Sequence, residues 1–435
     1  MMTPVRYGQN LFRAGGTAGS VFSLIAATLG SGTLAFAYAV MMNGYVLGPL
    51  LIIFGALVSY YTGMLIVKCS VKTGRTRYED IALAIYGPRW AFWTSVLNLG
   101  CLMGFTFSYI VYVKKAIPSI IQMYVDEDKI PVILRNEQWG GNIFWGIIFS
   151  FGIMFPMSIP RSASALRFTS LFGVLCSMYL CLGVTGLFFS SKDIVADPSK
   201  NLGELEAFKV SYKGIVSTVP LIIFAYMYQV NIPMIYVELE ERTAPQMGKI
   251  IAAGSSVAVA FYCLVGVFGY AVFAGDPGAL CSKNILTADS SLFKSNPVIQ
   301  VGNFALLFSV IAAAPLCVLP SKDTVEELFY KEKGMTSKQN FFVTLALTTV
   351  NCVMALFIPS IGEAMTLVGS TINPIIGFIL PVVFYWDQIK EKSIFSIEKM
   401  TGIANCAVII VVSVLSLVKF FTDLIEDNAD ESCLA

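Results

Sequence analysis

The chain has 435 residues, of which 56% are hydrophobic and only 13% are charged, and its net charge is +1. A soluble domain carries about twice that share of charged residues, and the balanced charge gives no reason to expect nucleic acid as a partner. Histidine is absent, which removes the commonest metal ligand and the one side chain that titrates near neutral pH. These features predict a membrane protein that is not an enzyme and that needs no cofactor or metal.

Long uncharged stretches predict eleven membrane-spanning helices, because a bilayer is crossed by about 20 apolar residues. The first stretch, 14–67, is long enough for two helices joined by a turn at Asn43 and Gly44. The expected spans are 17–40, 46–68, 91–117, 141–160, 168–190, 215–237, 250–274, 299–320, 341–359, 364–386 and 402–421. No cleavable signal peptide is expected, since the second span follows the first directly. The fold class is therefore all-α and polytopic, and 1–435 is expected to be a single transmembrane domain.

The distribution of Lys and Arg predicts the orientation of the spans. With the N-terminus in the cytoplasm, most of these residues fall in cytoplasmic segments, for example Lys72, Arg75 and Lys390. An odd number of spans then places the C-terminus on the extracellular or lumenal side. Cys281 and Cys433 fall on that same side, and the sequence alone leaves a disulfide between them open.

The first span is interrupted by the sequence TLGSGT, residues 28–33. Small residues in a membrane helix allow close packing against a neighbour, which is one explanation. The other is an unwound segment, which is tolerated at membrane depth only where it is buried in protein or lines a cavity. Unwinding would free backbone N–H groups at the start of a half-helix, where partial positive charge favours a carboxylate.

The sixth span carries a second interruption, because Pro220 opens it and Pro233 lies deep inside it. Between the prolines lies a polar patch of Tyr226, Tyr228, Gln229 and Asn231. Proline cannot donate a backbone hydrogen bond. Interrupted helices at matching places in two halves are typical of transporters built from inverted repeats. We therefore expect two five-helix repeats, 17–190 and 215–386, followed by an eleventh helix at 402–421.

Five segments in the expected order resemble the amino acid/auxin permease family, especially its system A/N-type and vacuolar branches. They are SVFSLIAATLGSGTLAFAYAVMMNG in the first span, GFTFSYIVYVKKAIP in the third, IPMIYVELEERT in the sixth, AAAPLCVLPSKDTVEEL in the eighth and VGSTINPIIGFILPVVFYW in the tenth. The resemblance runs from about residue 17 to 421. It implies an eleven-helix, leucine-transporter-like fold with broken helices 1 and 6, and secondary transport of amino acids.

The resemblance also implies a substrate site. Gly30, Ser31 and Gly32, with Thr28 beside them, would bind the substrate carboxylate through backbone N–H groups and the serine hydroxyl. On the sixth helix the pocket would be lined by Phe224, Ala225, Tyr226 and Gln229, with free carbonyls for the ammonium group.

Tyr109 on the third helix would close one wall of this site. The alternative for Tyr109 is a buried phenol that donates to a neighbouring carbonyl.

Two positions depart from the sodium-coupled members of the family. Their helix-1 asparagine corresponds to Ala26, and their helix-8 threonine corresponds to Ala313. These alanines remove two side-chain oxygens, and sodium prefers oxygen ligands, so the sequence predicts sodium-independent transport. Proton coupling normally uses an acid or histidine within the membrane. Glu238 and Glu363, at the ends of the sixth and tenth helices, are the nearest candidates for gating or a proton-linked role, and the sequence leaves facilitated diffusion and proton symport open.

No acidic residue lies in a span to pair with a basic substrate, so a neutral amino acid is expected, because an unpaired buried charge is costly. The alternatives are a cationic amino acid transporter, and a transporter-like sensor that binds an amino acid and signals through a partner. The expected partners are a small-molecule amino acid, the lipid bilayer and, under the symport alternative, protons; a monomer is expected. The membrane stays open between the plasma membrane and a vacuolar or lysosomal one.

Overall fold

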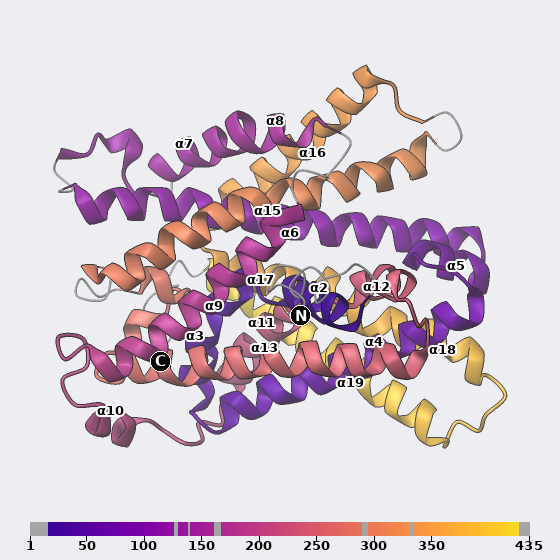
Figure 1. Ribbon diagram of the computed structural model, residues 1–435, viewed down its shortest axis with the longest axis horizontal. Helices are drawn as coiled ribbons and strands as arrows, with labels where there is room; N and C mark the ends of the chain where they lie inside the picture. Colours follow the sequence, from indigo (N-terminus) through magenta and orange to yellow (C-terminus); the bar gives the residue numbers. More distant parts are fainter. Residues whose placement is uncertain are drawn as a thin grey trace, which may run out of the picture.

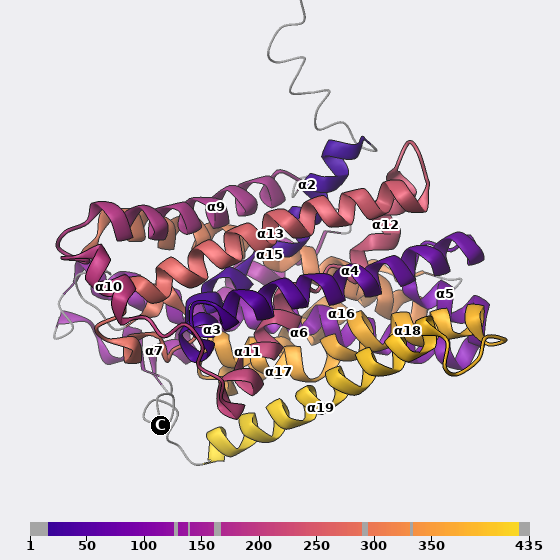
Figure 2. The ribbon, with the colours of Figure 1, turned by 90° about the horizontal axis from the view of Figure 1, so that it is seen from below.

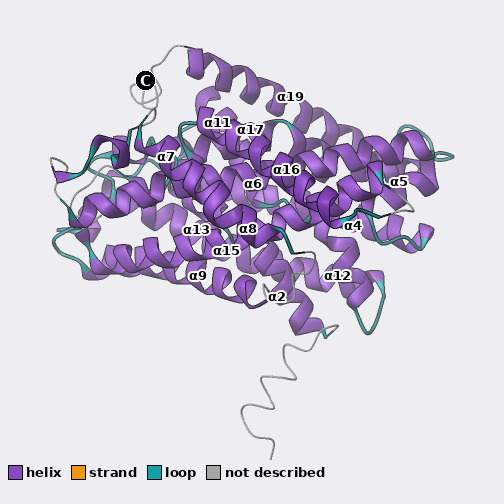
Figure 3. Cartoon of the chain, turned by 90° about the horizontal axis from the view of Figure 1, so that it is seen from above, coloured by secondary structure: helices purple, strands orange, loops and turns teal. Residues whose placement is uncertain are grey.

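The structure is a computed structural model that describes residues 16–125, 129–137, 140–160, 167–288, 295–330 and 334–425. Within these ranges the regular structure is entirely helical, as Figure 3 shows. The all-α class follows from the bilayer, in which a helix satisfies every backbone polar group within its own segment.

Eleven apolar segments account for most of the helices. In chain order, the first six are α2 (Thr17–Thr28), η1 (Ser31–Ala35) and α3 (Phe36–Asn43); α4 (Leu47–Thr73); α6 (Pro88–Tyr124); α7 (Gly141–Ile147), η4 (Ile148–Met154) and α8 (Phe155–Ser158); α9 (Arg167–Ser190); and α11 (Tyr212–Ala225), η6 (Gln229–Asn231) and α12 (Ile232–Glu238).

The remaining five are α13 (Ala244–Val272); α15 (Pro297–Phe329); α16 (Ser337–Phe357); α17 (Ile361–Ser370), η10 (Pro374–Ile379), α18 (Leu380–Trp386) and η11 (Asp387–Ile389); and α19 (Ile397–Ile425). Two short helices lie outside the apolar segments, α5 (Tyr78–Tyr86) and α10 (Pro198–Glu204). We call the two ends of the molecule the α5 end and the α10 end, since these helices lie at opposite ends of the long axis (Figure 1).

In the described ranges, nine helices are long and apolar enough to cross a membrane, or eleven if each bent pair is one span. The predicted number of spans and their order are confirmed. Most helices extend a few residues beyond the predicted bounds, because a helix continues past the apolar run into the headgroup region until a capping residue or a glycine ends it.

The turn predicted at Asn43 and Gly44 separates the first two spans. Gly44 has φ of +90°, and a Cβ there would lie 2.6 Å from the carbonyl oxygen of Ala207. The left-handed conformation and the close backbone approach both require glycine. The turn is therefore fixed by sequence and by contact with the segment that leads to α11.

The tenth span, predicted at 364–386, is bent by 44° between α17 and the segment that begins at Pro374. Pro374 has no N–H, so it cannot donate to the carbonyl four residues earlier, on Ser370. The helix resumes as a π-helix over Pro374–Ile379. The bend arises because the proline in STINP removes a helix bond in the middle of the span.

The sixth span lies at the centre of the bundle. In its most apolar window 78% of the residues are buried by protein, compared with 22% for α19. Figures 1 and 2 show α11 and α17 surrounded by other helices, while α19 runs along the outside. The sixth span is therefore mostly enclosed by protein, whereas α19 is placed to face lipid.

Two buried lysines donate hydrogen bonds to the carbonyls at the C-terminal ends of two helices. The Nζ of Lys114 on α6 donates to the carbonyls of Ala355 and Ile358, each at 2.7 Å, where α16 ends. The Nζ of Lys322 on α15 donates to the carbonyl of Ser158 at 2.6 Å, where α8 ends. A cation at a helix C-terminus satisfies carbonyls that have no intrahelical partner.

The two lysine contacts are related by the inverted repeat. The third span reaches the end of the ninth, and the eighth span, which is the third of its own repeat, reaches the end of the fourth. Lys322 lies toward the α5 end, since Glu327 farther along α15 pairs with Arg77, whereas Lys114 lies toward the end of α6 that is distant from α5. Each lysine therefore links one five-helix repeat to the other.

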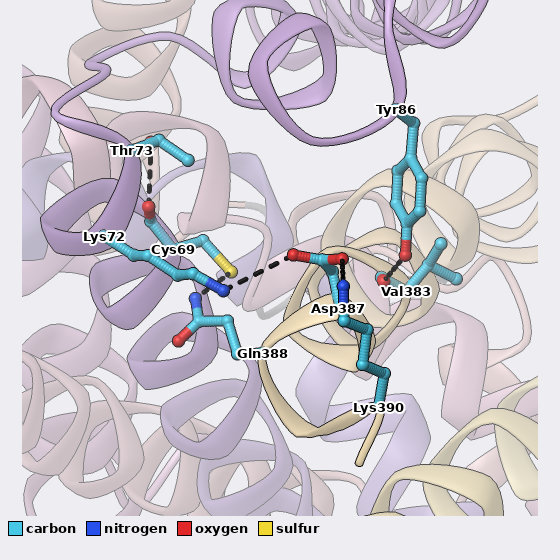
Figure 4. Close-up of polar contacts among 8 residues, drawn as sticks. All are labelled: Cys69, Lys72, Thr73, Tyr86, Val383, Asp387, Gln388 and Lys390. Atoms are coloured by element: carbon cyan, nitrogen blue, oxygen red, sulfur yellow. Dashed lines mark hydrogen bonds and ion pairs between the residues drawn. The ribbon is translucent and has the colours of Figure 1, made fainter.

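At the α5 end, polar contacts join the second and tenth spans (Figure 4). Lys72 forms an ion pair with Asp387 at 3.4 Å, the amide of Gln388 contacts the sulfur of Cys69, and the hydroxyl of Tyr86 on α5 donates to the carbonyl of Val383 at 2.7 Å. These contacts tie α4 and α5 to the end of the tenth span.

Arg77 adds a link at the same end, because its guanidinium pairs with Glu79 at 2.5 Å and with Glu327 of α15 at 2.7 Å. Burial raises the pKa of the Glu79 carboxyl from its usual 4.5, and the neighbouring Arg77 partly opposes that shift. The ion pair with Glu327 therefore links the loop after the second span to the eighth span.

Candidate functional site

The first span breaks where the sequence predicted. Its two halves, Thr17–Thr28 and Gly32–Asn43, meet at 54°, and Gly30 lies between them with an extended backbone, φ −152° and ψ −147°. The amides of Gly30 and Gly32 make no backbone hydrogen bond within the described part of the chain. The break therefore presents backbone donors at the start of η1 and α3.

The sixth span breaks over three residues, 226–228, between α11 and η6. The amide of Tyr228 turns back to the carbonyl of Tyr226 at 3.0 Å, and the carbonyls of Phe224 and Ala225 accept no backbone amide from the described residues. The interruption that the sequence predicted for the sixth span is confirmed. The break therefore presents backbone acceptors.

The two breaks lie side by side. A Cβ at Gly32 would lie 3.0 Å from the Cβ of Ala225, so the start of the second half of helix 1 touches the end of α11. One side chain reaches both breaks. The hydroxyl of Tyr262 on α13 donates to the carbonyl of Thr28 at 2.7 Å and lies 3.4 Å from the carbonyl of Ala225.

The two glycines of the interruption have different surroundings. Gly32 is packed against Ala225, whereas nothing lies within 4 Å of a Cβ built at Gly30. Gly30 is also partly exposed, while Gly32 is buried. Close packing thus accounts for Gly32 and not for Gly30, which borders open space at the break. The side chain of Ser31 lies outside the described part of the structure.

Thr28 is placed at the break, but its hydroxyl donates to the carbonyl of Leu24 at 2.7 Å. This hydroxyl is therefore engaged within its own helix, and the part of Thr28 that faces the site is its backbone carbonyl.

Tyr109 is partly exposed, and no hydrogen bond joins its hydroxyl to a described residue. The role of Tyr109 at one wall of the site stays a prediction. Phe224, on the sixth helix, instead contacts the third span through Phe105, with ring centroids 5.0 Å apart. The third span thus packs against the break in the sixth.

The other predicted residues of the sixth helix are buried. The hydroxyl of Tyr226 has no partner among the described residues, and neither does the Oε1 of Gln229. The side-chain amide of Gln229 donates to Thr62 of α4 at 3.3 Å, and the hydroxyl of Tyr228 pairs with Ser255 of α13 at 3.0 Å. Unpartnered polar atoms at this depth are costly unless a ligand or water satisfies them.

The acidic candidates are not at the breaks. Glu238 is the last residue of α12 and is exposed. Glu363 lies in the first turn of α17, where its backbone amide donates to the side chain of Ser360. Ala26 and Ala313 are each partly exposed on α2 and α15, and neither has an oxygen on its side chain to offer a cation.

The arrangement can bind a zwitterion. Free amides on helix 1 suit a carboxylate, the carbonyl of Phe224 on helix 6, which accepts no backbone amide from the described residues, suits an ammonium group, and the space beside Gly30 is open. The described residues at the two breaks carry no charge of their own.

A family model described as transmembrane amino acid transporter protein matches residues 13–425. The chain therefore belongs to that family, the amino acid/auxin permeases. The sodium-coupled neutral amino acid symporter 2 of Danio rerio is 24% identical over 398 residues, which cover 88% of this chain and 77% of that protein. The sodium-coupled neutral amino acid transporter 4 of Pongo abelii is 22% identical and covers 94% of this chain and 84% of that protein.

Two solved structures share the fold. The structure of MhsT in complex with L-phenylalanine has a TM-score of 0.58 at 11% identity and covers 92% of this chain and 97% of its own. A manganese transporter of Eremococcus coleocola has a TM-score of 0.54 at 11% identity, with 98% and 90% covered. These likenesses establish the leucine-transporter-like architecture, and with it the predicted 5+5 inverted repeat with broken helices 1 and 6. The chain is thus an amino acid transporter by family and an integral membrane protein.

Tyr262 is the residue of the site that sequence reasoning missed. It is a single tyrosine in the apolar segment VAFYCLVG of the seventh span, and no spacing connects it to residue 28 or residue 225. A tyrosine hydroxyl inside a membrane does need a hydrogen-bond partner, and that requirement was the available signal.

Proposed function

We propose that this protein moves a neutral amino acid across its membrane by alternating access and without sodium. One observation supports this above the others: two adjacent helix breaks offer free amides and free carbonyls, and no described side chain at the breaks is charged. That set of groups is complementary to a zwitterion whose side chain is neutral. A cationic substrate would bring an additional charge that no acid at the breaks balances.

Sodium independence rests on oxygen ligands that this chain lacks. Ala26 and Ala313 stand where side-chain oxygens are expected in sodium-coupled members, and Tyr262 already donates to the carbonyl of Thr28. The relatives from Danio rerio and Pongo abelii are sodium-coupled by name, so sodium coupling is the competing possibility that the experiment must address.

The test is uptake of radiolabelled amino acids by purified protein in liposomes. A panel of neutral, cationic and acidic amino acids is measured in sodium and in choline buffers, with and without a pH gradient. Saturable uptake of a neutral amino acid at equal rates in both buffers is the expected result. The pH-gradient arm separates proton symport from facilitated diffusion.

Other outcomes would overturn particular parts of the proposal. Uptake that requires sodium would contradict sodium independence, and preferred uptake of lysine or arginine would contradict the neutral substrate class. Binding of an amino acid without uptake would support a sensor instead. Gly186→Leu protein, altered on α9 away from the breaks, serves as a control variant in every arm of the experiment.

A further inference from the structure

The side chain of Tyr262 contacts four residues of the two broken helices. Its hydroxyl contacts the carbonyls of Thr28 and Ala225, its ring stacks on Phe36 with centroids 4.1 Å apart, and its ring meets that of Tyr226 edge-on at 5.4 Å. The side chain is fully buried. These contacts hold the phenol in one place and leave its hydroxyl no other described acceptor.

The two carbonyls that Tyr262 reaches each belong to the last residue of a half-helix. Thr28 ends α2 and Ala225 ends α11, so each carbonyl lies at the C-terminal end of a half-helix, where partial negative charge accumulates. Two such ends that converge at membrane depth favour a positive partner, and in broken-helix transporters that partner is a coupling cation. Here the partner is the O–H dipole of Tyr262.

We propose that Tyr262 is a positioning residue whose hydroxyl takes the place of a monovalent cation between the two breaks. This inference deepens the proposed function and rests on it, because it accounts for transport without sodium. The hydroxyl brings the half-helix ends together and leaves the amides beside Gly30 free for the substrate carboxylate. No ion needs to bind before the substrate does.

The proposal predicts that removal of the hydroxyl creates a need for a cation. Tyr262→Phe keeps the ring, and with it the stacking on Phe36, but it leaves the carbonyls of Thr28 and Ala225 without a donor. In choline buffer the KM for the substrate should rise roughly tenfold, the equivalent of one strong hydrogen bond. Sodium or lithium should restore most of that loss, because a small cation can coordinate the freed carbonyls.

The control is Tyr228→Phe, which removes a buried phenol hydroxyl from the same break, one that pairs with Ser255. It should not make uptake respond to sodium. Substrate-induced stabilisation against heating, measured in detergent with sodium and with choline, gives a second readout if uptake is too slow to measure.

Three outcomes would contradict the role proposed for Tyr262. The first is Tyr262→Phe protein with unchanged KM in choline. The second is an equal loss in both buffers, which would indicate a purely structural hydroxyl. The third is a sodium response in Tyr228→Phe of the same size. Failure of the underlying function is seen separately, because it would appear as sodium-dependent uptake in the unmodified protein.

Discussion

Gly30 and Gly32 are two residues apart and serve different purposes. Gly32 allows the start of the second half of helix 1 to touch Ala225, while Gly30 borders open space and has a backbone conformation that any residue can adopt. Steric reasoning therefore assigns packing to Gly32 and leaves open space beside Gly30, where the proposed substrate would bind.

Gly30→Leu should abolish uptake and leave the protein folded, because the added side chain would enter open space that the substrate needs. Gly186 on α9 is exposed and has no atom within 4 Å of its built Cβ, so Gly186→Leu is the matched control and should transport normally. Uptake in liposomes and size-exclusion profiles in detergent measure the two effects. Normal transport by Gly30→Leu would indicate that the small residues of the interruption serve helix packing instead.

Two phenols of the site should respond differently to loss of their hydroxyls. No hydrogen bond joins the hydroxyl of Tyr109 to a described residue, whereas the hydroxyl of Tyr228 pairs with Ser255. Tyr109→Phe should keep the thermal stability and raise the KM. Tyr228→Phe should lose about 1 kcal/mol of stability. Melting in detergent and uptake kinetics distinguish the two, and equal melting temperatures for both variants would contradict the assignment.

At the scale of elements, the half-helices explain how a site forms without charged side chains. Each break ends one helix and begins another at membrane depth, so donors and acceptors that would pair inside a continuous helix become available. The tenth span is interrupted in the same way, at Pro374, and its Gly377 lies against Met227 and Gln229 of the sixth break. Three interrupted spans therefore converge on one region of the bundle.

The lysine contacts at the ends of α8 and α16 should be needed for stability. Lys114→Met and Lys322→Met each leave buried helix-terminal carbonyls without a donor, at a cost of about 1–3 kcal/mol per unpaired group. We expect both variants to melt at a lower temperature than the unmodified protein, and by similar amounts because the two contacts are related by the repeat. Lys249→Met, on the exposed face of α13, is the control.

Higher melting temperatures for the two methionine variants would show that burial of the lysine charge costs more free energy than its hydrogen bonds to the helix-terminal carbonyls contribute. Thermal unfolding monitored by fluorescence in detergent measures whether the melting temperature falls or rises.

For the whole molecule, the orientation can be tested through a disulfide. Cys281, in the loop between α13 and α15, is disulfide-bonded, and disulfides persist on the oxidising side of a membrane. Cys433 lies outside the described residues. The predicted orientation places the loop of Cys281 on the extracellular or lumenal face.

A maleimide that cannot cross membranes should label cells that carry the protein in the plasma membrane only after treatment with a reductant that also stays outside. The eight cysteines found free among the described residues lie buried or half-buried, so they should contribute little. Labelling that appears only after permeabilisation would reverse the predicted orientation.

The sequence by itself determined the class, the number of spans and the places of the first two interruptions. Uncharged runs of about 20 residues can hardly be anything but membrane helices, and glycines or prolines inside such runs remove local helix bonds wherever the rest of the chain lies. The residues expected at the breaks, such as Gly30 and Ala225, could therefore be named from local sequence and family pattern.

Only the tertiary structure decided which groups meet across the breaks. The contact of Gly32 with Ala225, the phenol of Tyr262 between two helix ends, and the lysines that join opposite repeats all connect residues far apart in the chain. A hydrogen bond depends on distances of about 3 Å and on direction, and no periodicity in a sequence encodes such a distance between segments that first meet when the bundle is packed.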